Sequence, residues 1–193
     1  MKFNPEIHHR RSIRLKGYDY SQNGAYFVTL CNWNRECVLG EIAEVKAEKP
    51  EMVLNEYGKI VRDEWIRTAL IRQEIEIGEF IVMPNHFHGI VFIQGRGDRP
   101  VALTEDRPGP KSKSVGSFLA GFKSIATKRV NEIRQSPGAP VWQRNYYEHI
   151  IRDESEYNRI REYIINNPAN WHDDENNPEN IVFVCRGDRR SPN

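Results

Sequence analysis

Two histidines one residue apart, His86 and His88, are the side chains whose spacing most directly indicates chemistry. They begin a run of aromatic and β-branched residues over 86–94, which predicts a strand. On a strand both imidazoles point to the same face, about 6.6–7 Å apart along the backbone. Two imidazoles so placed can bind one metal ion, although a pair near a strand start can also simply line a polar face. The spacing alone leaves both interpretations open.

A second pair, Tyr163 and Asn167, is four residues apart and therefore occupies one face of an expected helix that starts at Asp153 and ends at Pro168. The phenol could act as a nucleophile and the carboxamide oxygen as a metal ligand. Tyr163 also continues an apolar stripe with Tyr157, which is typical of a half-buried core residue. Asn167 precedes a proline and could simply end the helix.

The pattern of apolar residues predicts the elements that must position these groups. We expect strands over 24–33, 74–83, 86–94 and 141–152, helices over 52–71, 114–134 and 153–168, and a loop over 95–112. The two middle strands are expected to form an antiparallel hairpin. The order β-α-β-β-α-β-α predicts an α+β fold, a ferredoxin-like or RRM-like sandwich with a mostly antiparallel four-stranded sheet covered by helices. The domain prediction is a basic N-terminal arm over 1–20, one domain over 21–170 and a C-terminal tail over 171–193.

Composition narrows the class of protein. The 193 residues contain no run of about 18 apolar residues, and the N-terminus lacks the apolar core of a signal peptide, so we expect a cytoplasmic protein with no membrane partner. Three cysteines without CxxC spacing support neither a disulfide framework nor a zinc ribbon.

Charge is segregated along the chain although the net charge is only +1. Residues 107–134 hold seven cations and one acid, and residues 1–20 hold five cations and two acids. The stretches 36–84 and 151–180 are acidic, with eleven and eight acids against six and three cations. Two basic surfaces on an acidic body would suit a phosphate-rich partner, or they are solvated helix faces.

Five sequence segments carry a resemblance to a known family. They are Tyr26-Phe27-Val28-Thr29-Leu30-Cys31, Val82-Met83-Pro84-Asn85-His86-Phe87-His88-Gly89-Ile90, Gly121-Phe122-Lys123-Ser124, Trp142-Gln143-Arg144-Asn145-Tyr146-Tyr147-Glu148-His149-Ile150-Ile151-Arg152 and Tyr163-Ile164-Ile165-Asn166-Asn167-Pro168. In these segments the chain resembles the single-tyrosine HUH transposases, and among them the REP-associated tyrosine transposases and similar transposase-like proteins. The Met-Pro-Asn-His-x-His and Tyr-Ile-x-x-Asn-Pro segments, in this order and separation, are highly specific to that group.

The resemblance implies an HUH endonuclease that needs a divalent metal ion, Mg²⁺ or Mn²⁺. By position, His86, His88 and Asn167 would bind the metal, and Tyr163 would attack DNA to form a 5′-phosphotyrosine intermediate. Related transposases have glutamine four residues after the tyrosine, whereas this chain has Asn167 there, as the REP-associated branch has asparagine. The implied substrate is single-stranded DNA with hairpins, acted on in DNA transposition or recombination by a monomer or homodimer.

Residues expected to bind this DNA are the cations of the basic segments and one aromatic segment. They are Arg10, Arg11, Arg14, Lys16, Lys111, Lys113, Lys123, Lys128, Arg129, Trp142 and Arg144. Trp33, Trp142, Tyr146 and Tyr147 could stack on unpaired bases, and each of them taken singly could equally be a core residue.

Other functions fit the sequence less well. A rolling-circle replication protein or relaxase would add a helicase domain or a third histidine, and a 2H-type RNA phosphoesterase would need two His-x-Thr/Ser motifs. A non-catalytic DNA-hairpin-binding protein derived from a transposase remains the alternative to an enzyme.

Overall fold

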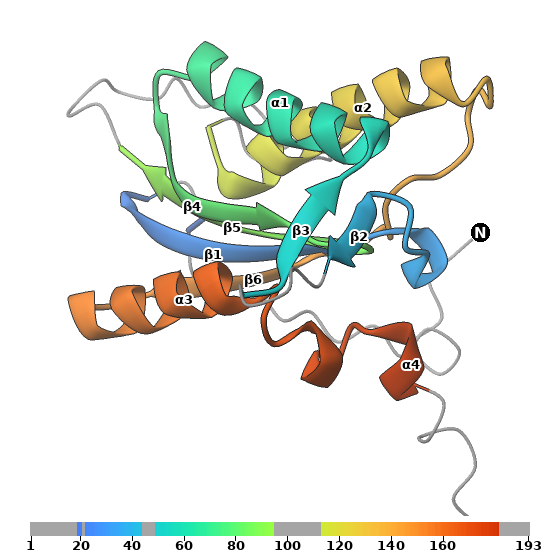
Figure 1. The fold of residues 1–193 in the computed structure, drawn as a ribbon. Helices are drawn as coiled ribbons and strands as arrows, with labels where there is room; N and C mark the ends of the chain where they lie inside the picture. Colours follow the sequence, from blue (N-terminus) through green and yellow to red (C-terminus); the bar gives the residue numbers. More distant parts are fainter. Residues whose placement is uncertain (1–18, 21, 44–48, 95–112, 182–193) are drawn as a thin grey trace, which may run out of the picture.

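The computed structural model describes residues 19–20, 22–43, 49–94 and 113–181. Within them the chain forms a four-stranded sheet, a separate two-stranded hairpin and helices on both faces of the sheet (Figure 1). The elements are β1 Gly24–Cys31, η1 Trp33–Arg35, β2 Gly40–Ala43, β3 Glu51–Leu54, α1 Glu56–Ile71, β4 Ile75–Val82, β5 His86–Ile93, α2 Val115–Ile133, β6 Tyr147–Ile151, α3 Glu154–Asn166, η2 Trp171–Asp173 and α4 Pro178–Ile181.

The four-stranded sheet has the order β4-β5-β1-β6, and every neighbouring pair of strands is antiparallel. Helix α1 connects β1 to β4, and β5 lies between these two strands, which is the split β-α-β arrangement. The predicted α+β class and the predicted hairpin of β4 and β5 are therefore confirmed.

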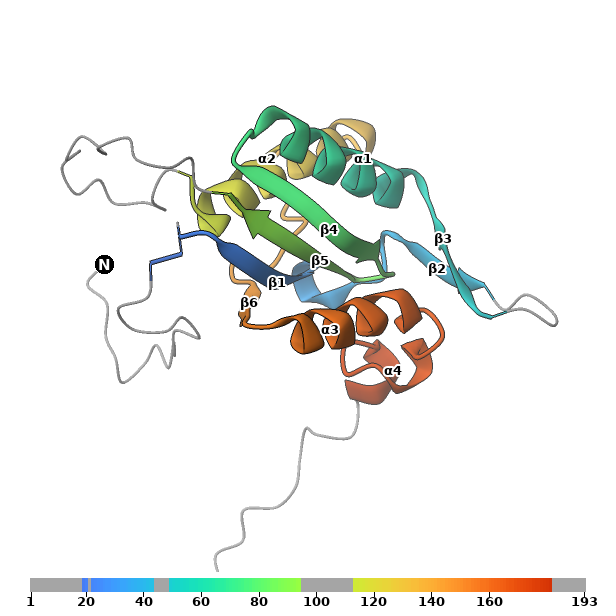
Figure 2. The ribbon, with the colours of Figure 1, turned by 90° about the vertical axis from the view of Figure 1, so that its left-hand side faces the viewer.

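Helices α1 and α2 cover one face of the sheet and α3 covers the other (Figures 1 and 2). The alternation of side chains along β5 sends Phe87 toward α1 and α2, where Trp65 packs against it with a ring-centroid distance of 4.5 Å. The opposite set, His86, His88 and Ile90, faces α3. The period of two in this strand thus separates a large aromatic core from the candidate site.

Two element boundaries differ from the sequence prediction. The helix expected over 52–71 starts only at α1, because Asn55 leaves the helical conformation and its side chain accepts a hydrogen bond from the Gly58 amide. The preceding residues form β3, which pairs with β2, an unpredicted strand. The strand expected over 141–152 is regular only in β6, and Trp142 makes just an isolated bridge with Asn32.

Helices α2 and α3 begin where the sequence predicts, each after a capping side chain. Ser114 caps α2, and the Asp153 side chain accepts a hydrogen bond from the Glu156 amide at the start of α3. Beyond α3 the chain continues through η2 and α4, inside the stretch expected to be a tail. The loop predicted over 95–112 lies outside the described residues.

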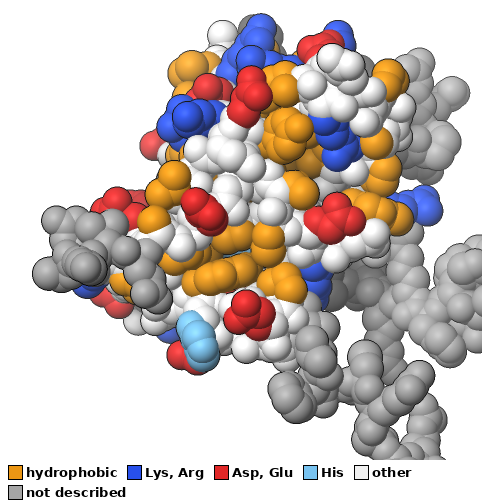
Figure 3. Space-filling model, turned by 45° about the vertical axis from the view of Figure 1, so that its right-hand side comes forward, with side chains coloured by type: hydrophobic (Ala, Val, Ile, Leu, Met, Phe, Trp, Pro, Cys, Tyr) orange, Lys and Arg blue, Asp and Glu red, His pale blue; other side chains and the backbone are white. Residues whose placement is uncertain are grey.

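One side of the molecule mixes charged and apolar side chains. In Figure 3 the basic side chains lie mainly toward the top of the view, over the layer of α1 and α2, with acidic side chains between them. Hydrophobic side chains gather in the middle of this face. Among the described helices, none is long and apolar enough to span a membrane.

Candidate metal and nucleophile site

His86 and His88 stand side by side at the start of β5, and both side chains are almost completely buried. Their ring centroids are 4.5 Å apart. The sequence prediction that the two imidazoles share one face is therefore confirmed in the geometry. Each ring also has a polar partner on its Nδ1 atom, which determines what its Nε2 atom can do.

Asn85 fixes the protonation of His86. The Asn85 Nδ2 atom donates to two backbone carbonyl oxygens, those of Arg35 and Asn176, at 3.0 and 2.7 Å. Since carbonyl oxygens only accept, this settles the orientation of the amide, and Asn85 Oδ1 must accept from His86 Nδ1 at 2.9 Å. The lone pair of His86 then lies on Nε2, which is buried and has no hydrogen-bond partner among the described residues.

Helix α3 brings Tyr163 to the second histidine. The Tyr163 hydroxyl lies 3.2 Å from His88 Nε2, while His88 Nδ1 lies 2.8 Å from the hydroxyl of Thr29 on β1. With Nε2 accepting from the phenol, Nδ1 carries the proton and donates to Thr29. Tyr163 is also 43% exposed, so the residue is open to solvent on one side.

Asn167 lies one turn beyond Tyr163, at the C-cap of α3, and is buried. Its Nδ2 atom donates to Asp174 Oδ2 at 3.3 Å, so its Oδ1 atom remains for another partner. Within the described part of the chain this oxygen has no hydrogen-bond partner. The buried and unpaired atoms Asn167 Oδ1 and His86 Nε2 are suitable ligands for a cation.

The structure adds Asp174, which the sequence prediction missed. This residue follows η2, and its Oδ2 atom lies 3.9 Å from His86 Nε2. The ligand atoms of His86, His88 and Asp174 all lie within 4.8 Å of one another, so this group could hold a metal ion. In the sequence Asp174 belongs to an acidic run, Asp173-Asp174-Glu175, which is typical of a solvated surface and offered no signal.

Burial sets the electrostatics of the site. It lowers the pKa of His86 to about 4, against the opposing effect of Asp174, and lowers the pKa of His88 well below its usual value, helped by His86. Both imidazoles are therefore neutral near pH 7, as metal ligands must be. Burial, with Asp174, raises the pKa of Tyr163 to about 12. The phenol is thus a weak nucleophile until positive charge enters the site.

The donor set fits a divalent cation on these observations: two neutral imidazole nitrogens, one unpaired amide oxygen and one carboxylate converge in a buried position. Between Mn²⁺ and Mg²⁺, the imidazole nitrogens favour Mn²⁺, whereas carboxylate and amide oxygens suit both ions.

The described cations predicted to bind DNA do not converge on this group. Lys123 donates to the carbonyl oxygens of Gln143 and Arg144, Arg129 pairs with the buried Glu64, and Lys128 lies 3.9 Å from Glu132. Trp142 is buried in the core, whereas Lys113 and Arg144 are exposed. Arg10, Arg11, Arg14, Lys16 and Lys111 lie outside the described residues.

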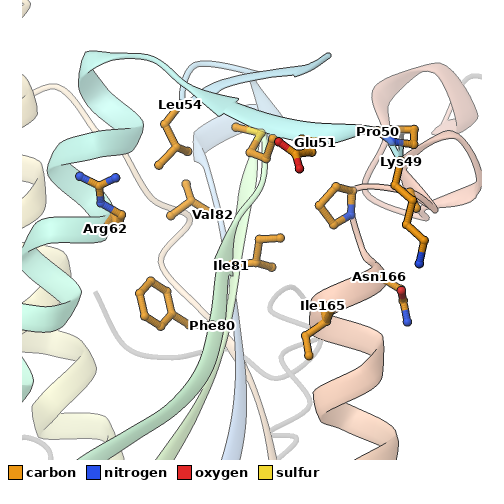
Figure 4. Close-up of a pocket in the computed structure, with 13 residues that line it drawn as sticks. Lys49, Pro50, Glu51, Leu54, Arg62, Phe80, Ile81, Val82, Ile165 and Asn166 are labelled. Atoms are coloured by element: carbon orange, nitrogen blue, oxygen red, sulfur yellow. The ribbon is translucent and has the colours of Figure 1, made fainter. Parts of the chain in front are cut away.

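An open groove of about 510 Å³ lies between β3, β4 and the end of α3 (Figure 4). Phe80, Ile81 and Val82 line it from the edge strand β4. Asn166 and Pro168, which flank Asn167 in the sequence, line its opposite side. The groove thus reaches the backbone that carries the amide ligand candidate.

No family model matches the chain. An uncharacterized protein of Haemophilus influenzae (strain KW20) is 42% identical over 180 residues, which cover 90% of this chain and 96% of the relative. The chain belongs to the same protein family as this relative.

Solved structures bear on the fold. A REP-associated tyrosine transposase bound to a REP hairpin superimposes with a TM-score of 0.56 at 20% identity, over 82% of this chain and 74% of that one. The two proteins share the α+β fold with its four-stranded antiparallel sheet. A second structure, of a Deinococcus radiodurans R1 protein, reaches a TM-score of 0.39 at 18% identity, over 80% of this chain and 97% of that one.

Proposed function

We propose that this protein cleaves and rejoins single-stranded DNA beside hairpin sequences, through a covalent bond between Tyr163 and a 5′-phosphate. The observation that carries the proposal is the position of the Tyr163 hydroxyl, 3.2 Å from His88 Nε2 and beside the unpaired His86 Nε2 and Asn167 Oδ1 atoms. The shared fold with a transposase whose structure contains a REP hairpin supports a DNA substrate.

In the proposed step the Tyr163 oxygen attacks the scissile phosphorus. The new O–P bond forms as the bond to the 3′ oxygen breaks, and the 3′ oxygen leaves and takes up a proton. The phenol proton passes to water, which reaches the half-exposed side chain. Because the energy of the phosphodiester is kept in the phosphotyrosine, a free 3′-OH can reverse the step without ATP.

His86, His88 and Asn167 would hold a divalent ion in this proposal, with Asp174 beside them. A bound ion would polarise the phosphate as a Lewis acid and stabilise the phenolate. Asn85 and Thr29 keep the two imidazoles oriented through their Nδ1 atoms, the role that outer hydrogen-bond partners have in metal sites.

The proposal is tested by incubating the protein with single-stranded repeat DNA and Mn²⁺ and looking for a covalent adduct on a denaturing gel. Wild type should form the adduct, and mass spectrometry should place the nucleotide on Tyr163. Tyr163→Phe removes one half-exposed hydroxyl and should abolish adduct and cleavage while the fold persists. Tyr57→Phe, on α1 across the sheet, is the matched control and should still cleave.

An adduct on Tyr146, Tyr147 or Tyr157, or cleavage by Tyr163→Phe, would show that Tyr163 is not the nucleophile. Hairpin binding by wild type without any adduct would instead favour the non-catalytic DNA-binding function.

A further inference from the structure

The strand register places one exposed tyrosine in the same row of the sheet as the metal-ligand candidate His88. His88 on β5 pairs with Thr29 on β1, and Thr29 pairs with Tyr147 on β6. Directly paired residues of antiparallel strands project to the same face, so all three side chains lie on the α3 face of the sheet. Neighbouring strands are about 4.8 Å apart, which puts the backbones of His88 and Tyr147 roughly 10 Å apart.

One buried ring joins this tyrosine to the nucleophile candidate. Phe27 on β1 stacks on His88 at a centroid distance of 5.3 Å and meets Tyr163 edge-on at 6.1 Å. The same ring meets Tyr147 edge-on at 6.3 Å. Tyr147 and Tyr163 therefore both contact the Phe27 ring and belong to one aromatic cluster.

Exposure distinguishes Tyr147 from Trp142 and Tyr146, the other aromatic residues of its segment that could stack on a base. Trp142 is buried and packs on Phe122, and Tyr146 packs against the core. The Tyr147 side chain is 48% exposed although its ring contacts a buried neighbour. Such a ring is held in place on one side and open to a ligand on the other.

A cation is close in sequence. Arg144 is exposed and precedes Tyr147 by three residues on the segment that leads into the edge strand β6. Lys123 holds this segment from α2 through the carbonyl oxygens of residues 143 and 144. An aromatic ring beside a cation on a fixed segment is the arrangement that proteins use to bind an unpaired nucleotide.

We propose that Tyr147 stacks on the unpaired base next to the phosphate that Tyr163 attacks, and that Arg144 contacts the DNA backbone beside it. The proposal rests on the proposed function and adds a nucleotide subsite to it. Every base has a stacking face, so the contact is tolerant of base identity and holds the strand across the row from His88 to Tyr147.

The test measures binding separately from cleavage, in a Tyr163→Phe background with labelled oligothymidylate as the probe. Tyr147→Ala should weaken binding by about 5- to 150-fold, the range measured for the loss of one base-stacking contact. Tyr147→Phe keeps the ring and should restore affinity to within about 2-fold of the parent. Leu70→Ala, at an exposed apolar residue on α1 across the sheet, is the matched control and should bind as the parent does.

Photocrosslinking locates the contact directly. Oligothymidylate carrying 5-iododeoxyuridine in place of thymidine should crosslink to the peptide that contains Tyr147, and Tyr147→Ala should lose that crosslink. Unchanged affinity in Tyr147→Ala, or crosslinks only to other peptides, would overturn the subsite. Tyr147-dependent binding in a wild-type protein that never forms a covalent adduct would overturn the proposed cleavage and keep the stacking contact.

Discussion

His86 and His88 are ready to bind a cation because other side chains use their Nδ1 atoms. Asn85 has both donors committed to backbone carbonyls, so it can only accept from His86. Thr29 holds His88 from the neighbouring strand. The Nε2 atoms therefore face the site by hydrogen bonding alone, before any cation arrives.

Replacing either histidine by alanine should abolish Mn²⁺ binding measured by calorimetry, and with it DNA cleavage. Hairpin DNA binding should persist, because phosphate contacts elsewhere dominate affinity. His172→Ala is the control, since the His172 side chain is 91% exposed. Full Mn²⁺ binding by both His86→Ala and His88→Ala would contradict the assignment of the ligands.

The buried imidazoles should also make stability depend on pH. The folded-state pKa of His86 is about 4 because the ring is buried, whereas the unfolded chain titrates near 6.5. Below pH 6.5 the unfolded state binds the proton and the folded state does not, so stability falls as the pH is lowered from 6.5 toward 4. We expect the free energy of unfolding in urea to drop by about 1 kcal/mol between pH 6.5 and 5.5 on this account.

A His86→Gln variant isolates that contribution, because glutamine does not titrate. The difference in pH dependence between wild type and His86→Gln should carry the effect, and parallel curves over this range would refute it.

The sequence revealed part of the site because spacing alone relates its residues. His86 and His88 share a face on any strand, and Tyr163 and Asn167 share one on any helix. Asp174 has no such relation, since it reaches the site through the path of the chain after α3. The use of Lys123 on backbone carbonyls was equally invisible, because its partners lie twenty residues away.

At the scale of elements, α3 contacts the sheet through polar side chains as well as through its apolar face. Tyr157 donates to Glu79 Oε2 at 2.9 Å, and Arg161 pairs with the other oxygen of the same carboxylate. The Arg161 hydrogen bond holds the pKa of Glu79 below its ordinary value, so the carboxylate stays ionised. These contacts on β4 fix the rotation of α3, and hence the direction in which Tyr163 points.

Helix α1 packs closely against β5 at Gly89, which lies between the candidate ligand His88 and Ile90. A Cβ atom at Gly89 would lie 2.9 Å from both Phe87 Cε1 and Trp65 Cζ2. Gly89→Ala should therefore lower the free energy of unfolding by about 1–3 kcal/mol in urea denaturation. Gly121→Ala on α2 is the matched control, because the nearest atom outside its own helix would be Arg72 Nη2 at 3.9 Å, and it should gain about 0.5–1 kcal/mol.

If both glycine variants changed the free energy of unfolding by the same amount, Trp65 would not pack against β5 as closely as these distances indicate.

Apolar periodicity predicted the long helices and the central strands but not short strands. Val53 and Leu54 continue the spacing of α1 backward, yet they lie in β3, because Asn55 starts the helix after them and β2 pairs with the segment. Four-residue strands carry too few residues for a period to show. Pairing of β2 with β3 is a tertiary contact that local sequence does not encode.

At the scale of the whole molecule, the sheet separates the described basic side chains of α2 from the nucleophile candidate. Helix α2 covers the face opposite α3 (Figures 1 and 2), so DNA bound to α2 would reach Tyr163 only around an edge of the sheet. The edge strand β6 and the segment that precedes it connect α2 to the α3 face. Exposed Arg144 lies on this segment.

The roles of two neighbouring cations on α2 can therefore be separated. The Lys128 side chain is 71% exposed, and its 3.9 Å contact with Glu132 is a surface pair of little strength. Arg129 instead pairs with Glu64, whose side chain is 2% exposed. If DNA binds through phosphates, affinity falls steeply with salt, and Lys128→Ala should reduce the log–log slope by roughly 0.7–0.9 with the fold unchanged.

Arg129→Ala should act on the fold, since within the described part of the chain it leaves the buried Glu64 with only the longer Arg67 contact at 3.5 Å. We expect a loss of roughly 3 kcal/mol in the free energy of unfolding, the cost of an uncompensated buried charge. Filter binding across a salt series and urea unfolding of both variants separate the two effects. A DNA affinity independent of salt would mean that the cations of 107–134 are a solvated surface, and an Arg129→Ala variant as stable as wild type would mean that Arg67 alone compensates the charge of Glu64.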